Sequence, residues 1–317
     1  MSLSNISSEK YKIEKTISYI CNCEYRYFLN KSNVVGIGCG CKIKNGFYTN
    51  QLCIKIFVTK KLPLNQLNTS DIVPSIYKGI PTDIKETGYF TAHSLTQKIR
   101  PTLGGYVIAN EYNPNFSGTL GCLVTDNKDL FVLSNNHVLV MLNKAPLGTK
   151  IIQPSCEYGG DPKTDIIANL SKYIEIKFKG LIRTPTNYTD CAIAKIIDKS
   201  LVSPEIALVG IPKGVSSPKL NQRVKKVGAI SELTTGVITS IHNTITVDYD
   251  IIKKTAIFKE QVLTTKLAEA GDSGAILLDE NNTAIGLLMS GSKNTSTFNS
   301  IDTVLKQLNV TLVTSKI

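Results

Sequence analysis

Residues 271–278 form the most informative stretch of the chain, Gly271-Asp-Ser-Gly-Ala-Ile-Leu-Leu278. A tight turn with two glycines leads directly into a short apolar run, which is typical of a buried β-strand that follows a sharp loop. Similar runs recur at Gly121-Cys-Leu-Val-Thr125, Leu130-Phe-Val-Leu-Ser134, Gly236-Val-Ile-Thr-Ser-Ile241, Thr244-Ile-Thr-Val-Asp-Tyr249 and Thr283-Ala-Ile-Gly-Leu-Leu-Met289. Short strands at this spacing predict an all-β barrel or sandwich beyond about residue 88.

The chain begins with a different pattern. Residues 8–30 carry apolar side chains at near-helical spacing and predict a helix. Residues 34–43 and 52–59 read as two strands, with Asn45-Gly46 as a hairpin turn between them. We therefore expect a small α/β module over residues 1–88.

The composition excludes several classes of protein. At about 150 residues per domain, 317 residues predict about two domains. The apolar content of 42% and the charged content of 19% argue against a disordered chain. No apolar run approaches the roughly 20 residues that span a bilayer, and the first residues lack the pattern of a secretory signal. We therefore expect a cytoplasmic protein with no membrane partner.

The net charge of +11 comes from lysine, since only four of the 36 basic residues are arginines. The lysines are spread along the chain, whereas nucleic-acid binding usually adds arginine for base contacts and aromatic residues for stacking. A lysine-driven nucleic-acid binder is therefore a weak alternative. We expect no specific nucleic-acid partner.

The eight cysteines give no clear disulfide pattern. Cys39 and Cys41 would share one face of a strand, whereas Cys21 and Cys23 would diverge on a helix. Four thiolates suit structural zinc, but zinc sites more often separate their ligands by two residues or more. We expect small buried thiols in a reducing compartment, with zinc at these four residues as the alternative. No metal site and no cofactor are predicted.

Three polar residues lie at the edges of β segments in the order His, Asp, Ser. His137 follows Phe131-Val-Leu-Ser-Asn-Asn136, Asp190 opens Asp190-Cys-Ala-Ile-Ala194, and Ser273 lies in the glycine-rich turn. Each alone would have an ordinary structural role. The informative feature is their order, His then Asp then Ser, with each residue at the edge of a β segment within one all-β region.

Other residues could fill the same roles. Asp161 and Asp165 also lie between His137 and Ser273, but neither opens an apolar strand. His93 and His242 lack a comparable polar corner. We therefore prefer Asp190 to the two other aspartates and interpret both histidines as structural or surface residues.

The three segments resemble the chymotrypsin/trypsin-like serine peptidases, and the resemblance covers roughly residues 103–312. It implies a mainly β fold with two six-stranded-type antiparallel β-barrels, at about 103–197 and 205–297. A C-terminal helix should follow, because Ile301, Val304, Leu305 and Leu308 have helical spacing. The peptidase domain would then span 89–317. Residues 34–88, with Lys60-Lys-Leu-Pro63 and Gly79-Ile-Pro-Thr-Asp-Ile84, resemble the leading module of bacterial trypsin-like proteins related to the plant narrow-leaf type.

The resemblance also implies a role for each site residue. Ser273 would be the nucleophile, His137 the general base and Asp190 the group that holds the imidazole. The amides of Gly271 and Ser273 would form the oxyanion hole. In zymogen-type relatives, the aspartate that matches Asp272 pairs with a newly made N-terminal amine. Here about a hundred residues precede the barrels, so Asp272 needs another partner or the loop becomes ordered only on binding.

The resemblance places a substrate pocket beside the nucleophile. Leu267, six residues before Ser273, would line its base, and Met289, Ser290 and Gly291 would flank it. An apolar or small side chain before the scissile bond is therefore expected. The sequence predicts a serine endopeptidase that acts on protein or peptide substrates and leaves open an activating partner. The alternative is a catalytically silent binding or scaffold protein on the same fold.

Overall fold

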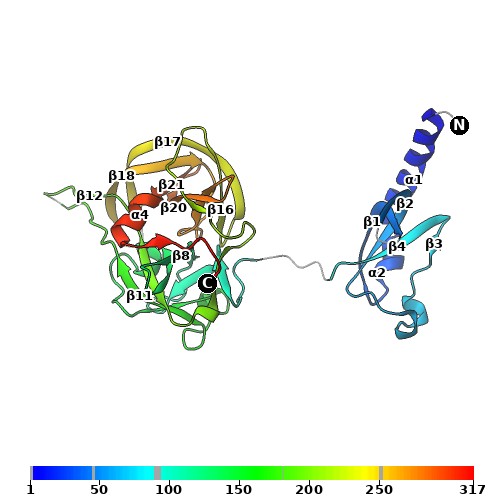
Figure 1. Ribbon diagram of the computed structural model, residues 1–317, viewed down its shortest axis with the longest axis horizontal. Coiled ribbons are helices and arrows are strands. Elements are labelled where there is room, and N and C mark those ends of the chain that lie inside the picture. The colour runs from blue at the N-terminus through cyan, green and yellow to red at the C-terminus, as the bar shows by residue number, and fades with distance from the viewer. Residues whose placement is uncertain (1–2, 45–46, 89–93, 181, 250–252) are drawn as a thin grey trace. The chain divides into compact units, whose positions relative to one another are not determined.

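The computed structural model describes residues 3–44, 47–88, 94–180, 182–249 and 253–317, so the predicted turn at Asn45-Gly46 lies outside the described residues. The chain divides into two units, Met1–His93 and Ser94–Ile317, each with its own core (Figure 1). Among the described residues, none of the helices is both long and apolar enough to cross a membrane.

The N-terminal unit is a small α/β module built on a four-stranded sheet with the order β1-β2-β4-β3. Its elements are α1 (Leu3–Cys23), α2 (Tyr25–Leu29), β1 (Val34–Lys44), β2 (Phe47–Val58), the 3-10 turns η1 (Leu64–Gln66) and η2 (Thr69–Asp71), β3 (Ile76–Tyr77) and β4 (Ile80–Glu86). Alternate residues of a strand share one face, so Ile54 and Ile56 of β2 pack together against Ile17 and Ile20 of α1.

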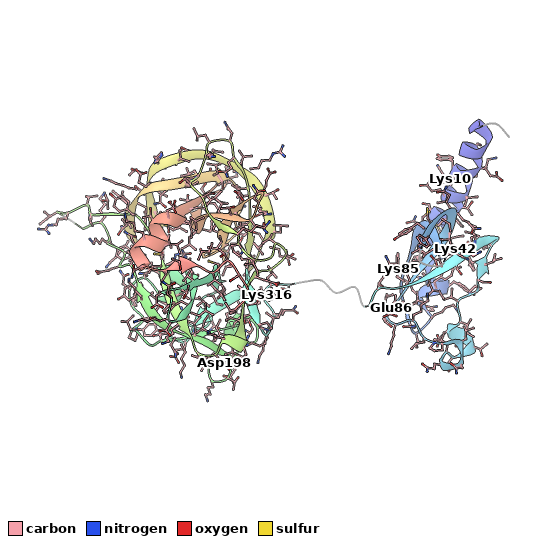
Figure 2. All side chains as sticks on the ribbon, viewed as in Figure 1. Lys10, Lys42, Lys85, Glu86, Asp198 and Lys316 are labelled. Carbon is pink, nitrogen blue, oxygen red and sulfur yellow. The ribbon has the colours of Figure 1, made fainter. Side chains whose placement is uncertain are left out.

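The single helix predicted for residues 8–30 is wrong in detail, because the structure has two helices that meet at Glu24. The Glu24 carboxylate accepts hydrogen bonds from the hydroxyl of Tyr77 and from Lys78, both at the β3–β4 turn. These contacts tie the interruption between the helices to the sheet. Lysines project from several elements of this unit, as Lys10 of α1, Lys42 of β1 and Lys85 of β4 illustrate (Figure 2).

The first barrel of the C-terminal unit closes as a six-stranded antiparallel ring. Its strands are β6 (Val107–Asn110), β7 (Gly118–Thr119), β8 (Cys122–Thr125), β9 (Leu130–Ser134), β10 (Lys150–Ile152), β11 (Ile166–Tyr173) and β13 (Ala192–Ile196). β7 and β8 form one side of the ring, because β7 pairs with β6 and β8 pairs with β9. The remaining strands follow in the order β9-β13-β11-β10-β6.

The second barrel is also a closed antiparallel ring, and it lies above the first in Figure 1. Its strands are β16 (Arg223–Gly228), β17 (Glu232–Tyr249), β18 (Lys254–Thr265), β19 (Ile276–Asp279), β20 (Thr283–Gly291) and β21 (Thr295–Ser300). β21 closes the ring by pairing with both β18 and β20. The predicted fold class, mainly β with two six-stranded-type antiparallel barrels and a C-terminal helix, is confirmed.

Strands β9 and β19 are apolar on both faces because both of their faces are buried. Leu277 of β19 points into the second barrel, whereas its neighbours Ile276 and Leu278 join the core between the two barrels. The same alternation places Val132 of β9 inside the first barrel and Phe131 between the barrels. This explains why the sequence has continuous apolar runs here rather than alternating polar and apolar residues.

The C-terminal helix α4 (Ile301–Leu308) completes the core between the barrels, since all four of its predicted apolar residues are buried there. Smaller elements surround the barrels: α3 (Asn136–Leu139), β5 (Thr102–Gly104), β12 (Thr186–Asn187), β14 (Val202–Ile206), β15 (Gly214–Val215), β22 (Thr311–Leu312), and the 3-10 turns η3 (Cys156–Tyr158) and η4 (Lys199–Leu201). The two short runs predicted at 236–241 and 244–249 are one strand, β17. Register shifts near His242 let it continue past the irregularity.

Candidate active site

His137 and Asp190 form a direct pair. The imidazole Nδ1 lies 2.6 Å from Asp190 Oδ2, and the backbone amide of His137 donates to Asp190 Oδ1 at 3.1 Å. His137 lies on α3, which follows β9, and Asp190 lies two residues before β13. Since β9 and β13 are neighbours in the first barrel, their polar ends meet at one edge.

Asp190 is fully buried, and donors surround its carboxylate. The hydroxyl of Tyr249, at the end of β17, donates to Oδ2 at 3.1 Å. The backbone amide of Asp190 donates to Asn299 Oδ1 of β21, and its carbonyl accepts from Asn135. The carboxylate is therefore held to accept the Nδ1 proton of His137. A neutral imidazole with its proton on Nδ1 keeps Nε2 free as a base.

Ser273 and His137 line the same cavity, which has a volume of about 570 Å³. The cavity lies beside the loop between β18 and β19, and β20 contributes Leu288 to Gly291 to its wall. Its apolar wall also includes Met141, Leu142 and Val247. The structure thus brings the predicted serine and the His–Asp pair to one partly apolar cavity.

Asp272, next to Ser273, has a partner within the chain. Its carboxylate is fully buried and lies 2.8 Å from the ammonium of Lys226 on β16, which is also fully buried. It also accepts from the backbone amides of Ile230, Ser231 and Glu269. Burial alone would raise the pKa of Asp272, but the Lys226 charge and the hydrogen bonds outweigh it and hold the pKa below its usual value. Of the two alternatives, the structure shows the first, because Asp272 has another partner within the chain.

The loop that carries Ser273 is also held from the first barrel. Thr119 of β7 donates its backbone amide to the Ser273 carbonyl at 2.8 Å and its hydroxyl to the Gly271 carbonyl at 2.9 Å. Gly271 and Gly274 both have φ of +99°, and a Cβ at Gly274 would lie 2.2 Å from Ser134 Oγ. Glycine is therefore required for this turn.

The backbone amides of Gly271 and Ser273 are free to bind a ligand. Within the described part of the chain, neither N–H group donates to a protein acceptor, although the neighbouring amides of Asp272 and Gly274 do. Gly271 and Ser273 are half-buried at the loop that borders the cavity. Two such donors, one residue apart in the same loop, are the groups that an oxyanion site beside the Ser273 hydroxyl would use.

Three of the four residues predicted for a substrate pocket line the cavity, and the fourth does not. Met289, Ser290 and Gly291 line the cavity, but Leu267 does not. Its side chain is only 2% exposed and packs in the interior of the second barrel. Lys266 and Ala268 face the cavity instead, because successive residues of an extended segment point in opposite directions. Lys266 is paired with Glu269 at the cavity wall.

The rival candidates lie elsewhere. Asp165 is paired with Lys98 and accepts from the amide of Asp161 in its own loop. His242 is exposed and bonds to Glu260 on the second barrel. His93 lies outside the described residues.

The cysteines do not form a visible metal site. In the described ranges, which include all eight cysteines, every thiol is free, and there is no group of three or more His, Cys, Asp or Glu side chains that could hold a metal ion. Cys39 and Cys41 share one face of β1, as predicted. Burial raises the pKa of Cys122 and of Cys191 to about 12, so these two thiols are unreactive.

Sequence reasoning missed three residues that shape the site: Lys226, Tyr249 and Thr119. Lys226 and Tyr249 lie 46 and 59 residues from the groups they contact, and Thr119 lies 152 residues from Gly271. The strand that carries Lys226 reads Arg223-Val-Lys-Lys-Val-Gly228, so no local pattern distinguishes the buried Lys226 from its charged neighbours Arg223 and Lys225.

Comparisons with known proteins give structural matches only. No family model matches the chain, and no curated protein matches it. Among solved structures it is similar to Thermobifida fusca protease A, with 19% identity over 67% of this chain and 98% of that chain and a TM-score of 0.49. It is also similar to Cellulomonas bogoriensis chymotrypsin, with 17% identity over 67% of this chain and 98% of that chain and a TM-score of 0.48. A third similar structure is Nocardiopsis protease, with 16% identity over 66% of this chain and 97% of that chain and a TM-score of 0.48.

Proposed function

We propose that the protein is a serine endopeptidase that hydrolyses peptide bonds with Ser273 as nucleophile. The observation that carries this proposal is the pair of His137 and the buried Asp190, with His137 at the same cavity as Ser273 and the free amides of Gly271 and Ser273 in the loop beside it. A nucleophile, an oriented base and an oxyanion site are the three parts that acyl transfer requires.

In the proposed mechanism, His137 Nε2 removes the proton from the Ser273 hydroxyl as the oxygen attacks the substrate carbonyl. The ring then carries a positive charge, which the Asp190 carboxylate stabilises across the 2.6 Å contact. The amides of Gly271 and Ser273 stabilise the oxyanion, and each such donor typically lowers the barrier by about 3–4 kcal/mol. His137 next gives the proton to the leaving amine, and water hydrolyses the acyl-enzyme by the same steps.

The Lys226–Asp272 contact supports an oxyanion loop that is organised in the free chain. Lys226 supplies, within the chain, the positive partner for Asp272 that a new N-terminal amine supplies in zymogen-type relatives. We infer that activity needs neither cleavage of the preceding residues nor an activating partner. The apolar walls of the cavity, with the buried Met289 beside Ser273, support a preference for a small or apolar side chain before the scissile bond.

Hydrolysis of fluorescein-labelled casein tests this proposal with the Ser273→Ala variant. We expect the wild type to release peptides and Ser273→Ala to lose at least about a thousandfold in rate. Ser203→Ala, on β14 and outside the cavity, is the matched control and should keep the wild-type rate. Equal hydrolysis by Ser273→Ala would contradict the mechanism. A wild type that binds casein without cleaving it would favour the silent binding protein.

A further inference from the structure

Tyr249 joins the second barrel to the pair that activates Ser273. It is the last residue of β17, and its hydroxyl donates to Asp190 Oδ2 at 3.1 Å. That oxygen is the one that also faces His137 Nδ1 at 2.6 Å. Oδ2 therefore has two donors, one from each barrel.

The aromatic ring of Tyr249 is fixed on several sides. Phe178 packs edge-on against it with ring centroids 5.8 Å apart, and the His137 ring lies 6.3 Å away on a tilted plane. Leu142 and Met289 belong to the same apolar cluster. A ring held in this way has few rotamers, so the direction of its hydroxyl is set before any substrate arrives.

We propose that Tyr249 is a positioning residue that sets the orientation of Asp190 and the basicity of His137, which makes the activity depend on β17. This inference rests on the proposed serine peptidase function. The hydroxyl withdraws electron density from Oδ2, which weakens the hold of Asp190 on the protonated imidazole. It also prevents the carboxylate from rotating away from Nδ1.

The hydroxyl stays protonated throughout the working range. Burial raises the pKa of Tyr249 well above its usual value, and the neighbouring Asp190 charge raises it further. Tyr249 is therefore a permanent donor and not a proton carrier.

The other charged groups at the cavity that His137 lines are the same in wild type and in the variant that lacks the Tyr249 hydroxyl. The cavity includes Asp248 from β17, Lys266 and Glu269 from the loop before Ser273, and Lys293 after β20. Their effect on His137 cancels when wild type and Tyr249→Phe are compared. The substitution keeps the packed ring and removes only the donor.

The test measures the labelling rate of Ser273 by a fluorophosphonate probe against pH for wild type and Tyr249→Phe. We expect the limiting rate to fall about tenfold, with little change in the half-saturating probe concentration, because a hydrogen bond to a charged group is lost. The acid limb of the profile should move to higher pH, because Asp190, relieved of the Tyr249 hydrogen bond, then stabilises protonated His137 more strongly. Tyr158→Phe, on η3 and outside the cavity, is the matched control.

A second measurement does not depend on activity. The NMR titration of His137, assigned with His137→Ala, should show the same upward shift in Tyr249→Phe. If wild type is labelled and Tyr249→Phe has the same labelling rate, or the same acid limb in its pH profile, the positioning role of Tyr249 alone is overturned. Absence of labelling in wild type at every pH would overturn the peptidase proposal, and the NMR titration would then decide the Tyr249 contact by itself.

Discussion

Asp190 is a carboxylate with no solvent exposure, and its partners explain how it can be buried. Three donors from His137 and Tyr249 surround its two oxygens. Transfer of a charged group from water costs several kcal/mol unless hydrogen bonds replace the lost water. These donors are therefore a condition for the fold as well as for the orientation of the imidazole.

Asp190→Asn tests that orientation at the residue scale. The amide keeps the shape of the side chain, but its NH₂ group would donate to Nδ1 and leave the ring proton on Nε2, where it cannot act as a base. We expect hydrolysis to fall by about 10⁴-fold with the protein still folded. Peptide release from casein measures this loss. Asp161→Asn, in the rival loop, should retain the wild-type rate, and a comparable loss there would contradict the assignment of Asp190.

Short sequence motifs made His137, Asp190 and Ser273 predictable, because each lies at the end of a strand with a recognisable local pattern. Leu267 shows where this reasoning fails. The position six residues before Ser273 lies in the segment that borders the cavity. The direction in which each side chain of that segment points depends on the local backbone conformation, which the count does not give. Lys266 and Ala268 face the cavity, and Leu267 fills the barrel.

At the scale of elements, β16 and the loop before β19 act as one unit. Lys226 of β16 and Asp272 of the loop are both fully buried, so each charge depends on the other. Removing one partner from a buried pair leaves an uncompensated charge, which is far more costly than removing both. No local pattern pairs residues 46 positions apart, so this contact was not predictable from the sequence.

Lys226→Met should destabilise the C-terminal unit by about 3–5 kcal/mol. It should also disorder the free amides beside Ser273, so fluorophosphonate labelling should fall steeply. Urea unfolding measures the first effect, and the labelling rate of the remaining folded protein measures the second. Lys225→Met removes a half-buried lysine from the same strand and should change neither by much. Full labelling of folded Lys226→Met would show that the pair does not organise the loop.

The Lys226–Asp272 pair also predicts that the free energy of unfolding depends on pH in the acid range. The folded state lowers the pKa of Asp272 below its usual value near 3.8. A lowered carboxyl pKa adds stability that is fully present above the unfolded pKa and is lost as pH falls through the folded pKa. We expect the unfolding free energy of wild type to drop between about pH 5 and pH 2. The double variant Lys226→Met/Asp272→Asn should lose less over that range, and an equal loss would contradict the prediction.

At the scale of the whole molecule, the chain has separate cores. The apolar cluster of the N-terminal unit draws only on residues before 88, whereas the barrel cores begin with Leu95. The predicted boundary at residue 88 came from the end of the last strand pattern. Leu95 was not predicted to be in the barrel core, because an isolated apolar residue before the first strand has no periodicity to reveal it.

A fragment of residues 94–317 should therefore fold alone and label at the wild-type rate. Among the described residues, the apolar clusters of the two barrels draw on positions from Leu95 onward, so the melting temperature of the fragment should stay within about 2 °C of the corresponding transition in the full chain. Calorimetry of both proteins measures this. A fragment that unfolds or labels much more slowly would show that residues 1–93 support the site.

The most direct test of the central claim is the intact mass of the full chain after reaction with a fluorophosphonate, followed by peptide mapping. The account predicts a single adduct per chain, located on Ser273, in wild type and in the remote variant Ser203→Ala. It predicts no adduct in Ser273→Ala and very slow formation in His137→Ala. An adduct on another residue, or equal labelling of Ser273→Ala, would contradict the claim that Ser273 is the nucleophile that His137 and Asp190 activate.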